Sequence, residues 1–181
     1  MLGGGFMDNN YKYYNDWIYG YKMFKKNLTN QYGEKFEIGK IYIDSKIDKG
    51  LGFHFCKRIE DTLIFSNYGG YKNEELEFYE VCGKGKTYYY ENDYVGIYDV
   101  YASEELKIIR GVPRNELIEM FLNMDGFVNK DRIQRFLSLY QLNQDEIVIF
   151  KDRFVNDSKI LKMIGYYQED DRDAFIKKRT K

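Results

Sequence analysis

The chain has 181 residues, enough for one ordinary domain with a small helical extension. Lysine and arginine (28) nearly balance aspartate and glutamate (29), which argues against a general binder of polyanions, because such a protein needs a net basic surface. Tyrosine is abundant (19 residues), and we interpret the tyrosines as residues of half-buried strands.

The cysteine content and the N-terminal segment bear on the cellular setting. Cys56 and Cys82 are too few for a disulfide framework, so a reduced, intracellular setting is expected. The start, MLGGGFMDNNYKYYNDW, has neither a basic region nor an apolar segment, so it is not a signal peptide, and no apolar run approaches the length of a membrane span. We therefore expect a soluble, cytoplasmic protein with a disordered leader over residues 1–16, and Met1 and Met7 both remain candidates for the true start.

An α+β domain is predicted over residues 17–113, with a mixed, mainly antiparallel sheet. Alternating apolar residues and glycine-centred breaks indicate strands at 17–24, 34–43 (with a bulge at Gly39), 50–56, 75–83, 86–92, 94–102 and 106–112. One short helix is expected after the GFHFC strand, from Lys57 to Ser66, where the apolar spacing becomes helical. The GKG stretch at 83–85 is predicted to be a hairpin turn.

An all-helical extension is predicted from residue 114 to 181. Pro113 marks the boundary, because proline is tolerated at the first position of a helix. Asn129 and Asn143 are candidate N-caps, and Gly165 is a candidate helix stop. One buried helical face is expected from residues at i, i+3, i+4 and i+7, namely Ile133, Phe136, Leu137 and Tyr140. The last segment, EDDRDAFIKKRTK, is expected to be a fraying helix.

The stretch GLGFHFC at residues 50–56 contains the only histidine and one cysteine. On a strand, His54 and Cys56 point to one face and Phe53 and Phe55 to the other. With Cys82 they would supply three metal ligands, one fewer than a closed zinc site requires. A Cys–His nucleophile is the other alternative, although no third orienting group is identifiable. We favour a half-buried structural histidine, and no motif indicates a cofactor.

Three segments resemble a domain family of unknown function found in bacteriophage and giant-virus proteins: GYKMFKKNLTNQYGEKFEIGKIY, GLGFHFCKRIEDTLIFSNY and EFYEVCGKGKTYYYENDYVGIYDVYASEELKIIRGVP. The family's strands occur in the same order, over Tyr19 to Pro113, with Phe36 where the family often has tyrosine. The composition is similar to that of a mimivirus-like protein. The resemblance implies a viral accessory protein, in the host cell interior or the virion, and implies no reaction.

A more distant resemblance is to ADP-ribosyltransferases, in the GFHFC strand with its following helix and in IYDVYASEELKII. It implies that His54 lies near a nicotinamide and that Glu104 or Glu105 polarises the ribose. The first strand, GYKMF, lacks the family's NAD-holding Arg or His-Gly pair. An ADP-ribosyltransferase-like enzyme that uses NAD is therefore kept as an alternative interpretation of the chain.

The favoured hypothesis is a non-enzymatic binding or structural module whose unknown partner is a macromolecule, with a protein favoured over nucleic acid. A third hypothesis is single-stranded nucleic-acid binding through exposed tyrosines such as Tyr88, Tyr89 and Tyr90.

Overall fold

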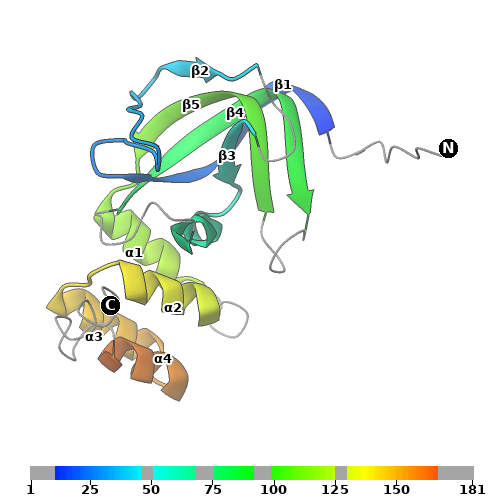
Figure 1. The fold of residues 1–181 in the computed structure, drawn as a ribbon. Helices are drawn as coiled ribbons and strands as arrows, with labels where there is room; N and C mark the ends of the chain where they lie inside the picture. The colour runs from blue at the N-terminus through cyan, green and yellow to red at the C-terminus, as the bar shows by residue number, and fades with distance from the viewer. Residues whose placement is uncertain (1–10, 46–50, 68–75, 92–98, 125–129, 167–181) are drawn as a thin grey trace. The chain divides into compact units, whose positions relative to one another are not determined.

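The structure is a computed structural model that describes residues 11–45, 51–67, 76–91, 99–124 and 130–166. It has the predicted α+β architecture (Figure 1). The chain consists of two compact units, Met1–Val112 and Pro113–Lys181, each with its own core of buried residues. The first unit contains the strands and the second contains the α-helices. None of the described helices is both long enough and apolar enough to cross a membrane.

Unit 1 is a bent antiparallel sheet whose hydrogen-bonded strands close into a ring. Its elements are β1 (Tyr11–Lys25), β2 (Ile41–Ile43), β3 (Phe53–Cys56), the 3-10 helix η1 (Ile59–Asn67), β4 (Leu76–Glu91) and β5 (Asp99–Gly111). Strand β1 pairs with β4, β4 with β5, β5 with β3, and β3 with β1. Strand β2 pairs with β5 beyond the end of β3.

The interior of the ring is filled by side chains from alternate positions of the strands, as the period of two requires. Phe55 is fully buried, and its ring stacks on Tyr101 with a centroid distance of 5.4 Å. Burying such a side chain stabilises the fold by about 2–3 kcal/mol. The other members of this core are Phe24, Leu28, Phe36, Val81, Leu106 and Ile108.

Two glycines allow the strands to approach the ring of Phe55. A Cβ atom on Gly20 would lie 2.3 Å from the backbone oxygen of Cys56, and one on Gly83 would lie 2.6 Å from Cε1 of Phe55. These distances are below van der Waals contact, so both positions exclude any larger residue in this geometry. The interior of unit 1 therefore depends on glycine as much as on aromatic residues.

The 3-10 helix η1 is fixed to the start of β5 by a buried carboxylate. Asp61 is fully buried, accepts a hydrogen bond from Arg58 Nε at 3.0 Å and accepts another from the Asp99 backbone N–H at 3.4 Å. The side chains of Ile59 and Leu63, which belong to this helix, are buried. The predicted helix at 57–66 is thus present, two residues shorter at its start and with 3-10 geometry.

Several predicted boundaries differ from the structure. The GKG stretch is not a hairpin turn, because β4 continues through it, and a bulge with Gly85 at φ +81° takes up the irregularity. Gly39 (φ +83°) lies in the turn before a much shorter strand than the 34–43 predicted. Residues 11–16 belong to β1, because Tyr11–Tyr14 pair with β4, so the predicted leader does not extend to residue 16. Residues 1–10 lie outside the described part of the chain.

Unit 2 contains the helices α1 (Arg114–Leu122), α2 (Lys130–Leu139), α3 (Gln144–Arg153) and α4 (Ser158–Ile164). Its core is aromatic, with the ring of Phe136 stacked on Phe121 at 3.9 Å and on Phe150 at 6.1 Å between centroids. The predicted buried face of α2 is confirmed for Ile133, Phe136 and Leu137, while Tyr140 follows the helix and is half-buried.

Three of the predicted helix signals of unit 2 lie at the ends of described helices. Asn143 caps α3 by accepting a hydrogen bond from the Glu146 N–H, and Gly165 is the C-cap of α4. Pro113 precedes α1 as its N-cap instead of occupying the first helical position. Asn129 and the predicted fraying helix at 169–181 lie outside the described residues.

Candidate functional site

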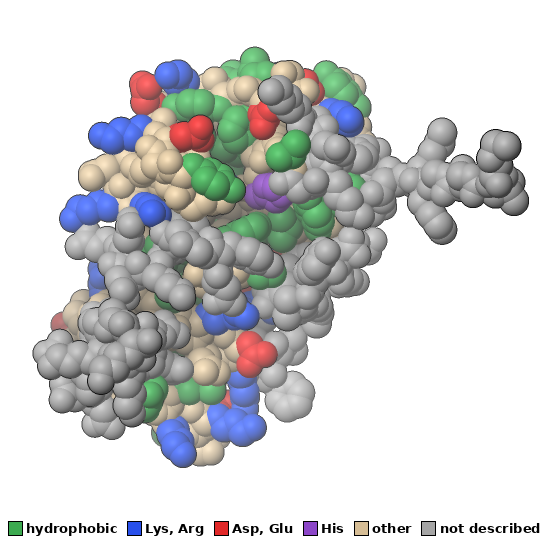
Figure 2. All heavy atoms as spheres, viewed as in Figure 1, with side chains coloured by type: hydrophobic (Ala, Val, Ile, Leu, Met, Phe, Trp, Pro, Cys, Tyr) green, Lys and Arg blue, Asp and Glu red, His purple; other side chains and the backbone are tan. Residues whose placement is uncertain are grey.

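His54 and Cys56 lie on β3 with their side chains on the face opposite the phenylalanine core, which confirms the predicted alternation. The imidazole of His54 is close to two aromatic rings, Phe65 of η1 at 6.1 Å and Tyr90 of β4 at 5.7 Å between centroids. Its Nε2 lies 3.5 Å from the Tyr90 hydroxyl. The imidazole, purple in Figure 2, is partly visible from outside among hydrophobic side chains.

Burial makes this imidazole a weak base. Desolvation, aided by the nearby positive charge of Lys22, lowers the pKa of His54 to about 4, although a backbone hydrogen bond at Gly52 opposes the shift. His54 is therefore neutral at physiological pH. It cannot supply the imidazolium that a general acid or a Cys–His ion pair requires.

Two further side chains lie next to His54, the half-buried Lys22 and the fully buried Cys56. The Lys22 ammonium donates a hydrogen bond to the backbone oxygen of His54 at 2.6 Å, and desolvation lowers its pKa to about 8. Burial raises the pKa of the Cys56 thiol well above its usual range, and Asp61 adds to the effect. A protonated, buried thiol is a poor nucleophile and a poor metal ligand. These pKa shifts favour a structural role for this group of side chains over covalent chemistry.

The glutamates proposed as catalytic residues have partners away from His54. His54 pairs across the sheet with Ala102. The Glu104 carboxylate accepts a hydrogen bond from the Lys86 backbone N–H at 3.1 Å, in the bulge of β4. Glu105 lies 3.5 Å from the Lys84 ammonium and pairs with that residue across the sheet. Both carboxylates are thus engaged in local contacts of the sheet.

Cys82 is separated from the other two predicted metal ligands. It lies on β4, opposite Tyr19, whereas Cys56 lies on β3, opposite Tyr21, so strand β1 runs between the two thiols. Two strand spacings amount to about 10 Å, too far for a disulfide or a shared ion. Within the described ranges no three His, Cys, Asp or Glu side chains are grouped so that they could hold a metal ion.

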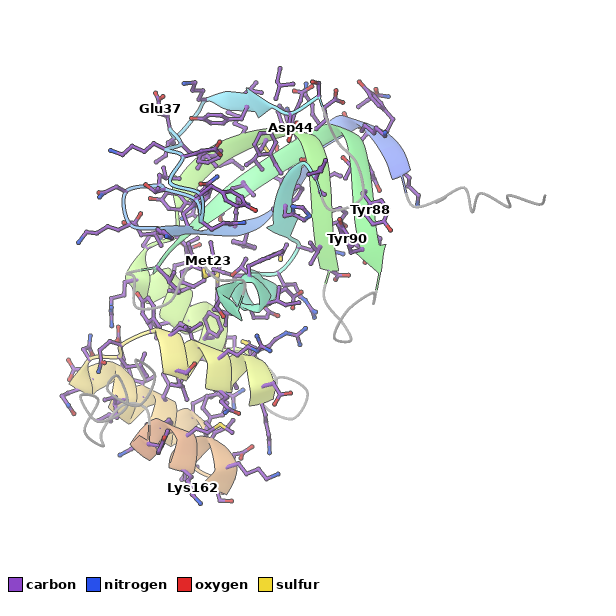
Figure 3. All side chains as sticks on the ribbon, viewed as in Figure 1. Met23, Glu37, Asp44, Tyr88, Tyr90 and Lys162 are labelled. Carbon is purple, nitrogen blue, oxygen red and sulfur yellow. The ribbon has the colours of Figure 1, made fainter. Side chains whose placement is uncertain are left out.

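The tyrosines predicted to be exposed are mostly enclosed. Tyr88 is fully buried, and Tyr89 and Tyr90 are half-buried. The rings of Tyr88 and Tyr90 contact each other, with their centroids 4.4 Å apart, and Figure 3 shows both residues on β4. Tyr89 donates a hydrogen bond from its hydroxyl to Asp99. The prediction that Tyr88 is exposed is therefore wrong, because composition does not show which tyrosines are buried, and Tyr89 and Tyr90 are only partly exposed.

A different surface carries exposed aromatic and aliphatic residues. On the outside of the ring, cross-strand pairing aligns Tyr19 of β1, Cys82 of β4, Lys107 of β5 and Ile41 of β2 in one row. Val81 and Leu106, which come directly before Cys82 and Lys107 in the sequence, are core residues. Because side chains alternate along a strand, this row faces outward. The side chain of Tyr19 is 67% exposed and that of Ile41 is 46% exposed, whereas Cys82 is covered.

A second row lies beside the first. Lys84 pairs with Glu105, which pairs with Ile43, and the Lys84 ammonium lies 4.7 Å from the ring centroid of Trp17. Ile43 is 69% exposed. We call the two rows, together with Tyr21, the outer face; its members are Trp17, Tyr19, Tyr21, Ile41, Ile43, Cys82, Lys84, Glu105 and Lys107. Aromatic residues line one margin and isoleucines the other, with charged residues between them.

A groove opens at one end of the outer face. It has a volume of about 330 Å³ and is lined by Tyr19, Tyr21, Lys57, Glu80 and Ile109. The Glu80 carboxylate accepts hydrogen bonds from two of the guanidinium nitrogens of Arg110, with Nε at 2.9 Å, so its charge is paired. Burial raises the pKa of the Cys82 thiol, while Lys107 and Lys84 oppose that shift. The outer face thus offers contact area and mixed charge without a reactive group.

Comparisons of the chain with protein-family models, curated proteins and solved structures find no match. The outer face could not be recognised from the sequence, because its members come from four strands that are distant in the sequence. Its local signals are the alternation of Trp17, Tyr19 and Tyr21 along β1 and that of Ile41 and Ile43 along β2.

Proposed function

We propose that the protein is a non-enzymatic binding module that recognises a protein partner through the outer face of unit 1. The observation that carries the proposal is the exposed aromatic and aliphatic margin of this face, with Tyr19 at 67% and Ile43 at 69% exposure. Protein interfaces are enriched in aromatic residues, which provide a large contact area at low entropic cost. The resemblance of Tyr19–Pro113 to a phage and giant-virus domain supports a role as a viral accessory protein.

The charges of the outer face favour a protein over nucleic acid. Lys84 is paired with Glu105, and Arg110 is paired with Glu80, which lines the groove. A nucleic-acid surface needs cationic side chains that are available to phosphates, and here the carboxylates of Glu105 and Glu80 neutralise Lys84 and Arg110. A mixed pattern of this kind suits a partner with charges of both signs.

The proposal is tested by co-purification of the tagged full-length chain from the cells in which it is naturally made. Three forms are compared: wild type, Tyr19→Ser on the outer face, and Tyr32→Ser as a matched control. Tyr32 is 81% exposed but lies in the turn after β1, away from the outer face. We expect one protein to be recovered by wild type and by the control. We expect its recovery to be reduced about tenfold with Tyr19→Ser, because exposed aromatic residues often act as anchors of an interface.

Two results would contradict the proposal. One is recovery of the same partner in equal amount with all three forms, which would place the binding surface elsewhere. The other is recovery of nucleic acid in place of protein, with binding that weakens steeply as salt increases.

A further inference from the structure

Strand β2 has one edge that pairs with β5, and among the described residues its other edge has no partner strand. Figure 1 shows β2 at the margin of unit 1. The Asp44 N–H donates to the Glu104 backbone oxygen at 2.8 Å. Since backbone groups alternate in direction along a strand, those of Tyr42 also face β5, and those of Ile41 and Ile43 face away from it.

The open edge is preformed. The Tyr42 hydroxyl accepts a hydrogen bond from the Glu37 N–H at 2.7 Å, and the ring of Tyr42 packs on Phe36 with centroids 4.6 Å apart. These contacts hold the turn and the strand in place. An open edge with apolar neighbours is a template for another strand, and natural proteins usually protect such edges with charge or proline.

We propose that β2 pairs with β2 of a second copy of this chain, antiparallel, about a two-fold axis through Tyr42. In that register Ile41 of one copy lies opposite Ile43 of the other, and both residues direct their backbone groups to the partner strand. Each of the two Ile41–Ile43 pairs then forms two backbone hydrogen bonds. The four isoleucine side chains, exposed in one copy, form a single cluster on the outer side of the joined sheets.

Charge complementarity identifies the second copy as the occupant. The same two-fold register places Lys40 of one copy opposite Asp44 of the other, and it does so twice. An opposite charge directly across two strands stabilises the pairing, and a like charge destabilises it. A self-complementary patch is what a two-fold dimer requires. The Lys40 ammonium lies 2.9 Å from the Glu37 carboxylate, and both side chains are exposed, so this contact still leaves the ammonium accessible.

The test is sedimentation equilibrium of the full chain from about 10 µM to about 1 mM, the range in which a small interface associates. Wild type is expected to approach twice the mass of one chain as the concentration rises. Lys40→Asp and Asp44→Lys are each expected to stay monomeric, because each places two like-charge pairs in the interface. An equimolar mixture of these two variants restores opposite charge at every pair and is expected to associate again.

Ile43→Lys is a second variant whose folding is not at risk, since the side chain is exposed, and it is expected to be monomeric. Any of three results would overturn the inference. These are wild type that is monomeric at every concentration, Ile43→Lys that still associates, and a mixture of Lys40→Asp and Asp44→Lys that fails to associate. Thermal unfolding of each variant verifies that it is folded. Failure here would leave the proposed partner binding intact, because that binding is measured through Tyr19 and not through β2 pairing.

Discussion

The surroundings of His54 determine its chemistry at the scale of a single residue. The sequence predicts its position correctly, because alternation on a strand places it opposite Phe53 and Phe55. Its burial against Phe65 and Tyr90 comes from segments that follow it in the chain, and the sequence does not show which of them will cover it. That burial, and not the residue type, makes the imidazole neutral.

The protonation of His54 can be measured directly, since it is the only histidine in the chain. An NMR titration of its imidazole is expected to give a pKa of about 4, compared with the usual value of 6.5. The unfolded chain binds the proton between these pH values and the folded protein does not, so stability is complete above pH 6.5 and falls towards pH 4. The loss is about 2–3 kcal/mol. A titration midpoint above about pH 6 would contradict the burial.

Gly20 provides a second prediction at this scale. In Gly20→Ala the new methyl group meets the Cys56 backbone oxygen at 2.3 Å, so β1 and β3 must separate. We expect a loss of about 1–3 kcal/mol in the free energy of unfolding, measured by denaturant titration. The matched control is Gly111→Ala, whose nearest atom, Cε1 of Tyr79, lies at an ordinary 3.5 Å. Equal effects of the two substitutions would show that close approach is not the cause.

At the scale of elements, periodicity predicts the existence of strands better than their ends. The glycines at 83 and 85 predict a turn, yet β4 passes through them, because β5 supplies pairing partners along almost the entire length of β4. Local sequence contains no information about that partner. Helix ends are more predictable, because a cap is a local interaction, as Asn143 shows.

Asn143 carries a prediction for helix α3. Its side chain accepts from the Glu146 N–H at 2.9 Å, while the Glu146 carboxylate accepts from the Asn143 N–H at 2.8 Å and is held by Arg114 at 2.6 Å. Asn143→Ala removes the first of these bonds and is expected to reduce stability by about 1 kcal/mol. Gln144→Ala, at an exposed neighbouring position, serves as the control and should change stability by less than about 0.5 kcal/mol. Circular dichroism during thermal unfolding measures both, and an unchanged midpoint in Asn143→Ala would exclude the cap as a stabilising contact.

At the scale of the whole molecule, composition and patterning predict the α+β class, and the structure has a strand unit followed by a helical unit. The outer face could not be predicted, since it depends on the register of β1, β4, β5 and β2 across the sheet. A one-residue change in that register would turn its side chains inward. The surface on which we base the function is thus a property of the assembled sheet.

The central claim is that the protein binds through the outer face and that His54 has a structural role. The most direct measurement is the affinity of the co-purified partner, by calorimetry with purified proteins, for wild type, Tyr19→Ser and His54→Ala. At a temperature where all three are folded, we expect Tyr19→Ser to weaken binding about tenfold or more and His54→Ala to remain within about twofold of wild type. Binding that is lost in folded His54→Ala and unchanged in Tyr19→Ser would contradict the account.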